Sequence, residues 1–230
     1  HLVRGTPVLP GVAYLEMARE ALDRSQALEP AGAGVRLRSV VWARSVALDA
    51  GPVDLHVDVF TRDDGRVAFE VFSGDELLHC QGTAEAFAVI PERLDLDALR
   101  AQCGQAVRSG ADCYAGFARL GLAYGPSFRL LDRIHVGRGQ ALARLEGAAA
   151  PMAAGFVLHP ALLDAALQAV AGLADPAESP ALALPFGVEV VEILGPCAGP
   201  MWAHVVAGAE PAAAEGMRRV DVTLCDYRGL

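Results

Sequence analysis

The chain has 230 residues, 53% of them hydrophobic, which is enough apolar material to bury a sizeable core. Its 28 acidic and 19 basic side chains give a net charge of −9, which disfavours nucleic acid as a partner. No apolar run reaches the roughly 18–20 residues that span a bilayer, and no signal peptide begins the chain, so we expect a soluble cytoplasmic protein without membrane association.

The first 90 residues predict one helix followed by an antiparallel meander. Residues 11–24 place Val12, Leu15, Ala18 and Leu22 on one helical stripe, and the helix should end before a loop at 30–34. Four strand-like runs follow, separated by turn residues, at 35–42, 53–61, 67–73 and 77–86.

The rest of the chain predicts a second helix beside antiparallel strands. Residues 91–112 have no clear period and are expected to be a linker, and residues 147–155 a loop. Helices are predicted at 113–120 and 160–172, with Pro160 at a favourable first position. Strands are predicted at 127–136, 140–146, 188–194, 201–207 and 219–225. We therefore predict an α+β fold with similar halves at 1–90 and 113–230.

The chain opens on a His-x3-Gly-x4-Pro motif formed by His1, Gly5 and Pro10. Gly5, Pro10 and Gly11 favour a tight approach to a helix N-terminus, whose N–H groups could stabilise a thioester oxygen. A neutral imidazole there could remove a proton. Taken alone, a histidine at a chain end is most often a frayed surface residue, and only the sequence that follows makes His1 a candidate.

A second candidate is the carboxyl group of Asp164, in the sequence from His159 to Gln168. Apolar neighbours predict burial, which would raise its pKa and make it a proton donor. Gln168, four residues later, would lie on the same helix face and could hold the carboxyl group. The alternative is an acidic residue placed in the first helical turn by the helix dipole.

Tyr124, Gly125 and Pro126 form a third candidate, at a predicted turn. The tyrosine hydroxyl could bind a substrate oxygen, or the segment could be a surface loop that leads into a strand.

Several other chemistries are excluded by composition. The chain has no lysine and no asparagine, which excludes Schiff-base chemistry and a Cys-His-Asn triad. Five widely spaced cysteines and unpaired histidines predict reduced thiols, no metal site and no cofactor. The cysteines are Cys80, Cys103, Cys113, Cys197 and Cys225, and the unpaired histidines are His56, His79, His135 and His204.

The order of the motifs resembles the dehydratase domains of modular polyketide synthases, which are double-hotdog domains. The resemblance rests on four motifs that span most of the chain: His1-x3-Gly5-x4-Pro10, Gly121-x2-Tyr124-Gly125-Pro126, His159-Pro160-x3-Asp164-x3-Gln168 and Leu184-Pro185-Phe186. Family members carry a strand-containing segment before the motif histidine, so the resemblance implies a first half shortened at its N-terminus.

The resemblance also implies roles for the motif residues. His1 resembles the catalytic base and Asp164 the catalytic acid, with Gln168 orienting the acid. Tyr124 resembles the pocket tyrosine, and Pro10 the residue that helps to set the histidine geometry; Gly11 resembles the first residue of the hotdog helix.

The implied activity is that of a hydro-lyase, which dehydrates a 3-hydroxyacyl chain to a 2,3-enoyl thioester. An acyl carrier protein would present the chain on its phosphopantetheine arm, beside neighbouring synthase domains and within a homodimer. Two alternatives stay open: added cyclic-ether formation or double-bond isomerisation, and a non-catalytic dimerising or carrier-docking domain. Carrier docking would need a local arginine patch, for which Arg129 and Arg133 are candidates.

Overall fold

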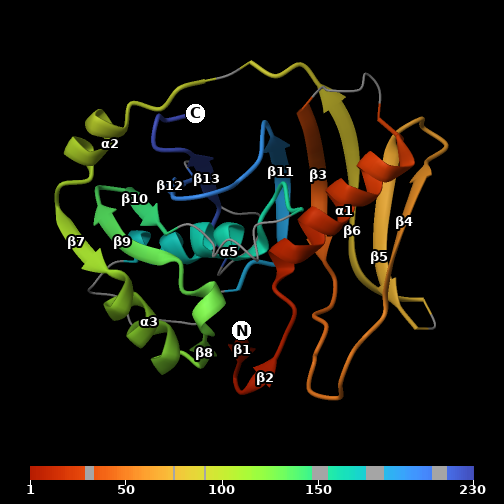
Figure 1. The fold of residues 1–230 in the computed structure, drawn as a ribbon, viewed down its shortest axis with the longest axis horizontal. Coiled ribbons are helices and arrows are strands. Elements are labelled where there is room, and N and C mark those ends of the chain that lie inside the picture. The colour runs from red at the N-terminus through yellow and green to blue at the C-terminus, as the bar shows by residue number, and fades with distance from the viewer. Residues whose placement is uncertain (29–33, 75, 91, 147–154, 175–183, 209–216) are drawn as a thin grey trace. The chain divides into compact units, whose positions relative to one another are not determined.

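The computed structural model describes residues 1–28, 34–74, 76–90, 92–146, 155–174, 184–208 and 217–230. The chain forms two compact units, His1–Pro91 with Ala183–Pro196 and Glu92–Leu182 with Cys197–Leu230. Each unit contains a five-stranded antiparallel sheet with helices against it, as the sequence predicts (Figure 1). The predicted loops at 30–34 and 147–155 lie mostly outside the described residues.

The sheet of the first unit has the strand order β11-β3-β6-β5-β4. Its strands are β3 (Gly34–Trp42), β4 (Leu55–Thr61), β5 (Val67–Ser73), β6 (Leu77–Phe87) and β11 (Gly187–Ile193). Helix α1 (Gly11–Ser25) packs on β4 and β5. In Figure 1 this helix crosses in front of the sheet.

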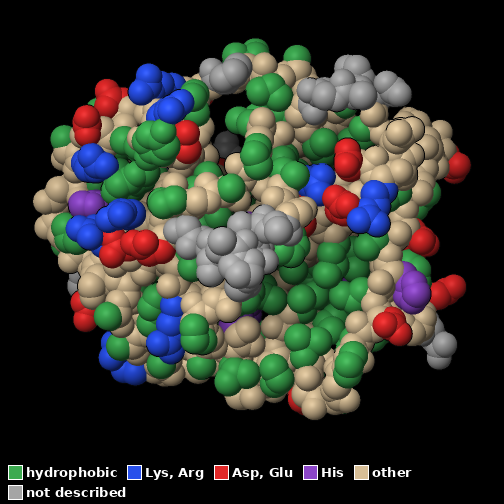
Figure 2. Space-filling model, in the orientation of Figure 1, with side chains coloured by type: hydrophobic (Ala, Val, Ile, Leu, Met, Phe, Trp, Pro, Cys, Tyr) green, Lys and Arg blue, Asp and Glu red, His purple; other side chains and the backbone are tan. Residues whose placement is uncertain are grey.

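Helix α1 forms because its apolar residues recur at helical spacing. The predicted stripe of Val12, Leu15, Ala18 and Leu22 is buried, each residue being at most 5% exposed. On the outer side, Figure 2 shows acidic and basic side chains next to one another over the helix. The predicted helix and its buried face are therefore confirmed.

The sheet of the second unit has the strand order β13-β12-β10-β9-β7. Its strands are β7 (Ala106–Ser109), β9 (Leu131–Val136), β10 (Gln140–Leu145), β12 (Met201–Ala207) and β13 (Val220–Cys225). Helix α5 (Pro160–Gln168) and the 3-10 helix η2 (Ala169–Leu173) pack on β9 and β10, and α3 (Gly110–Arg119) packs on β7 and β9. The shorter elements are α2 (Leu96–Gln102), β8 (Leu122–Ala123) and η1 (Pro126–Phe128).

The predicted division at 1–90, 91–112 and 113–230 differs from the observed units. Strand β11, expected in the C-terminal half, pairs with β3 of the first unit, with Val191 opposite Leu37. Residues 91–112 are not only a linker, since they contain α2 and β7 and belong almost entirely to the second unit. Helix α2 buries none of its residues, and its two leucines, Leu96 and Leu99, are only partly covered.

None of the helices in the described part of the chain combines the length and apolar character needed to cross a membrane.

A matched pair of glycine substitutions tests how closely α3 approaches β9. A Cβ on Gly110 would overlap the carbonyl oxygen of Leu131, so Gly110→Ala should destabilise the protein by about 2–3 kcal/mol. A Cβ on Gly116, in the same helix, meets nothing nearer than Nη2 of Arg119 at 3.8 Å. Gly116→Ala should therefore stabilise by about 0.5–1 kcal/mol. Urea unfolding of both variants measures the difference, and equal stabilities would contradict this packing.

Candidate active site

His1 begins a short β-hairpin that the sequence analysis did not predict. Strands β1 (Leu2–Val3) and β2 (Thr6–Pro7) pair antiparallel, and the N–H of Val8 donates to the carbonyl oxygen of His1 at 3.1 Å. The two turn residues, Arg4 and Gly5, both have positive φ, 50° and 88°, as a tight two-residue hairpin turn requires. Gly5 thus allows the turn that pairs β2 with β1 and brings Val8 next to the backbone of His1.

Pro10 and Gly11 connect this hairpin to α1. The N–H of Leu9 donates to the carbonyl oxygen of Val46 at 3.0 Å, which ties the segment to the first unit. Pro10 immediately precedes α1, and no side chain caps the helix. A Cβ on Gly11 would lie 3.1 Å from the Trp42 indole, so glycine allows this close packing.

The motif Leu184-Pro185-Phe186 leads into β11. Leu184 and Phe186 are 51% and 59% exposed. The carbonyl oxygen of Phe186 accepts a hydrogen bond from the N–H of Trp42 at 3.0 Å, which extends the pairing of β11 with β3. The hydrogen bond between this motif and β3 is therefore made by a backbone atom, not by a side chain.

Asp164 lies in the second turn of α5, not in the first turn as predicted. The helix has no acidic residue in its first turn, so the helix-dipole interpretation is wrong. The residue is only 8% exposed, beside Leu162 and Ala165, which are fully buried. Burial raises the pKa of Asp164 from 3.8 to about 6, and the hydrogen bond from Gln168 opposes this rise. The carboxyl group can thus hold its proton closer to neutral pH than an exposed aspartate.

Gln168 makes the contact with Asp164 that the helical spacing predicts. Its Nε2 donates to Oδ2 of Asp164 at 2.8 Å and also reaches the carbonyl oxygen of Phe128 at 3.2 Å. Its Oε1 accepts from the hydroxyl of Tyr114 in α3 at 2.9 Å. The sequence analysis missed Tyr114, because no periodic spacing links it to a residue so distant in the chain.

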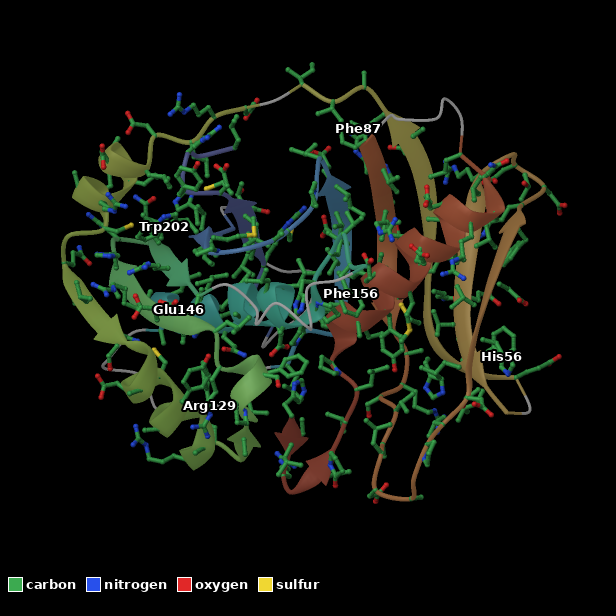
Figure 3. The ribbon with its side chains drawn as sticks, in the orientation of Figure 1. His56, Phe87, Arg129, Glu146, Phe156 and Trp202 are labelled. Atoms are coloured by element: carbon green, nitrogen blue, oxygen red, sulfur yellow. The ribbon has the colours of Figure 1, made fainter. Side chains whose placement is uncertain are left out.

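His159 caps helix α5. Its Nδ1 accepts a hydrogen bond from the N–H of Ala161 at 3.2 Å, and Pro160 is the first helical residue, as predicted. The ring is 2% exposed and lies edge-on to Phe156, which is labelled in Figure 3, with centroids 5.3 Å apart. The His-Pro pair therefore fixes where the helix that carries Asp164 begins.

Tyr124 lies at a turn, but its ring is half-buried rather than exposed. The ring packs edge-on to Phe117 at 5.5 Å, and burial raises the pKa of the phenol, which stays protonated near neutral pH. Gly125 and Pro126 lead into η1. The guanidinium of Arg129, labelled in Figure 3, donates to the Tyr124 carbonyl oxygen at 2.8 Å and closes the turn.

The remaining nucleophilic side chains are structural. All five cysteines are buried and none forms a disulfide, and burial raises the pKa of Cys80 to about 12 and of Cys225 to about 11. Among the described residues, no three His, Cys, Asp or Glu side chains group as metal ligands would.

The candidate residues thus belong to two groups. His1, Gly5, Pro10 and Gly11 lie in the first unit. Asp164, Gln168, Tyr124, Gly125 and Pro126 lie in the second, where Tyr114 joins them.

Two family models match the chain. One, described as the polyketide synthase dehydratase N-terminal domain, matches residues 91–230, and one described as the polyketide synthase dehydratase domain matches residues 1–74. Polyketide synthase PksN of Bacillus subtilis is 37% identical over 243 residues, covering 100% of this chain. The chain spans only 4% of that relative's length.

Solved structures share the fold over the whole chain. A trans-AT PKS dehydratase domain from Brevibacillus brevis is 35% identical, with a TM-score of 0.89, and the match covers 100% of this chain and 83% of that one. The dehydratase domain of RzxB from Pseudomonas fluorescens is 31% identical, with a TM-score of 0.85, and the match covers 99% and 83%. The predicted α+β double-hotdog fold is confirmed.

Replacing the buried carboxyl group should change how stability depends on pH. A folded-state pKa above the unfolded value means that the contribution of Asp164 to stability is fully present below pH 3.8 and is lost as pH rises from there through about 6. Asp164→Asn should escape this loss, so its stability relative to wild type should rise by about 2 kcal/mol between about pH 4 and pH 7. Urea unfolding across this range measures the difference. Asp63→Asn, at an exposed turn, is the control for the loss of one carboxyl group. A stability difference between Asp164→Asn and wild type that stays the same at every pH would contradict the raised pKa of Asp164.

Proposed function

Because the chain belongs to the polyketide synthase dehydratase family, we propose that it removes water from a 3-hydroxyacyl thioester to form a 2,3-enoyl thioester. An acyl carrier protein presents the substrate on its phosphopantetheine arm, and the reaction needs no metal or other cofactor. The observation that carries the proposal is the buried Asp164 carboxyl group, with its raised pKa and its hydrogen bond from Gln168.

In the proposed reaction, His1 is the base and Asp164 the acid. The neutral imidazole of His1 takes the proton from the α-carbon, and the electrons of that C–H bond form the new double bond. The C–O bond at the β-carbon breaks, its electron pair remains on oxygen, and the proton of Asp164 completes the departing water. The imidazolium then loses its proton to water and the carboxylate takes one up, which resets both groups.

The thioester oxygen becomes negative as the α-proton leaves, and backbone N–H groups at the start of α1 stabilise it in this proposal. Two observations are consistent with that role: no side chain caps this helix, and Gly11 adds no side chain at its first position. Tyr124, whose phenol stays protonated, donates a hydrogen bond to a substrate oxygen.

The proposed partners are an acyl carrier protein, neighbouring synthase domains and a second copy of the chain. Arg129 and Arg133 are weaker docking candidates than the sequence suggested, since each already has a partner. Arg129 binds the carbonyl of Tyr124, and Nε of Arg133 lies 2.7 Å from Oδ2 of Asp132. A tethered carrier would raise the local substrate concentration and make weak docking sufficient.

Turnover of a loaded carrier tests the assignment. Wild-type protein should reduce the mass of a 3-hydroxyacyl carrier protein by one water, as intact mass spectrometry would detect. His1→Ala and Asp164→Asn should each lower the rate by at least about 10²-fold, because each removes one proton-transfer group. His56→Ala and Asp63→Asn change exposed residues of the same types and should retain full activity.

Unchanged turnover in both His1→Ala and Asp164→Asn would overturn the proposed roles. A wild-type protein that leaves the carrier mass unchanged would favour the non-catalytic docking domain. Chromatography against linear and cyclic standards identifies cyclic-ether formation, which has the linear enoyl product as its intermediate.

A further inference from the structure

A chain of hydrogen bonds runs from the backbone of β9 to the Asp164 carboxyl group, entirely within the second unit. The N–H of Leu131 donates to the hydroxyl of Tyr114 at 3.0 Å. That hydroxyl donates to Oε1 of Gln168 at 2.9 Å, and Nε2 of Gln168 donates to Oδ2 of Asp164 at 2.8 Å. Hydrogen bonds therefore link β9, α3 and α5, which are separate segments of the sequence, to one carboxyl group.

The donors and acceptors in this series of hydrogen bonds favour one orientation of the Gln168 amide. The backbone N–H of Leu131 can only donate, so the Tyr114 hydroxyl accepts there. Its single proton has two acceptors within reach, and Oε1 of Gln168 at 2.9 Å is nearer than the carbonyl oxygen of Phe128 at 3.4 Å. On the other side, the carbonyl oxygen of Phe128 and Oδ2 of Asp164 both accept from Nε2. A flipped amide would place its oxygen against the Phe128 carbonyl oxygen and, when Asp164 is ionised, against the carboxylate as well.

The series of hydrogen bonds begins where the pairing of β9 with β10 is irregular. The register of β9 with β10 shifts between Arg144 and Leu145, so Arg144 opposes Arg133 while Leu145 opposes Leu131. Such bulges redirect backbone groups out of the regular ladder and are common beside functional sites. Leu131, at the bulge, supplies the N–H that holds Tyr114.

We propose that Tyr114 is a positioning residue for the acid: it locks the Gln168 amide so that the NH2 group, and not the oxygen, faces Asp164. This inference rests on the proposed function of Asp164 as proton donor. With Nε2 bound to Oδ2, the carboxyl proton is carried on Oδ1. If the amide turned, its oxygen would accept that proton in an internal hydrogen bond and compete with the substrate for it.

The surroundings of Tyr114 suit this task. Its ring packs edge-on to Phe117 and Tyr124, with centroids 6.0 and 5.8 Å away, and the Arg129 guanidinium lies 5.6 Å from the ring centre. Burial raises the pKa of Tyr114 to about 12, against the opposing hydrogen bond from Leu131, so the hydroxyl keeps its proton. The titratable or charged groups that act on Tyr114 within the unit are Asp164, Cys113 and Arg129. The charge of Asp164 also helps to raise the pKa of the neighbouring Tyr124 phenol, after the larger effect of burial.

The variant Tyr114→Phe removes the hydroxyl and keeps the ring. The dehydration rate should fall about tenfold with little change in KM, since the acid loses orientation rather than substrate contact. The pKa of Asp164 should rise, because the carboxylate loses a secured donor and the protonated form gains an acceptor. The alkaline limb of the rate profile should therefore move to higher pH. A purely structural role for Tyr114 would lower the rate without moving this limb.

Two further measurements make the test decisive. In a Gln168→Leu background, adding Tyr114→Phe should change the rate less than about twofold, because the tyrosine acts through the glutamine. Carbon-13 NMR titration of the Asp164 carboxyl group, assigned with Asp164→Asn, reports its pKa without turnover. Tyr227→Phe, at a residue that is 68% exposed, is the matched control and should change neither quantity.

Independent, additive rate losses for Tyr114→Phe and Gln168→Leu would overturn the proposal, and so would an unshifted pKa of Asp164. Absence of wild-type dehydration is a different result, since it would refute the proposed function. The NMR titration would still show whether Tyr114 controls the amide, and circular dichroism establishes that each variant is folded before it is compared.

Discussion

The burial of the Asp164 carboxyl group is the constraint on which the second unit depends. An ionised carboxylate in an apolar environment is costly, and the protein reduces this cost by raising the pKa and by providing a hydrogen-bond donor. The donor must itself be held, since a free amide can present either end. Tyr114 and the backbone of Leu131 hold it. A residue suited to donate a proton thus requires several ordered neighbours.

The helix that carries the carboxyl group is fixed at both ends by local interactions. His159 accepts from the N–H of Ala161 at its start, and η2 continues the chain against β9 and β10 after Gln168. Pro160 is the first helical residue, and its fixed φ favours a helix start at this position. Asp164 and Gln168 then face the same side because they are four residues apart.

Local pattern predicted the regular elements well and the irregular ones poorly. The apolar stripe of α1 and the spacing of Asp164 and Gln168 need only helical geometry, and both were correctly predicted. Helix α2 has no buried face, and the hairpin from Leu2 to Pro7 is too short to show alternation, so neither produced a signal. The family resemblance added the roles of the motif residues, which no periodicity could supply.

The sequence by itself determined most of the regular elements, the fold class and the family, because periodicity, turn residues and motif order can be read directly from the order of residues along the chain. Only the tertiary structure decided that β11 completes the sheet of the first unit and that Tyr114 reaches Gln168. The physical reason is the same in both cases. Strand pairing and side-chain hydrogen bonds depend on which groups meet in space, and residues 154 or 54 positions apart carry no local sign of their meeting.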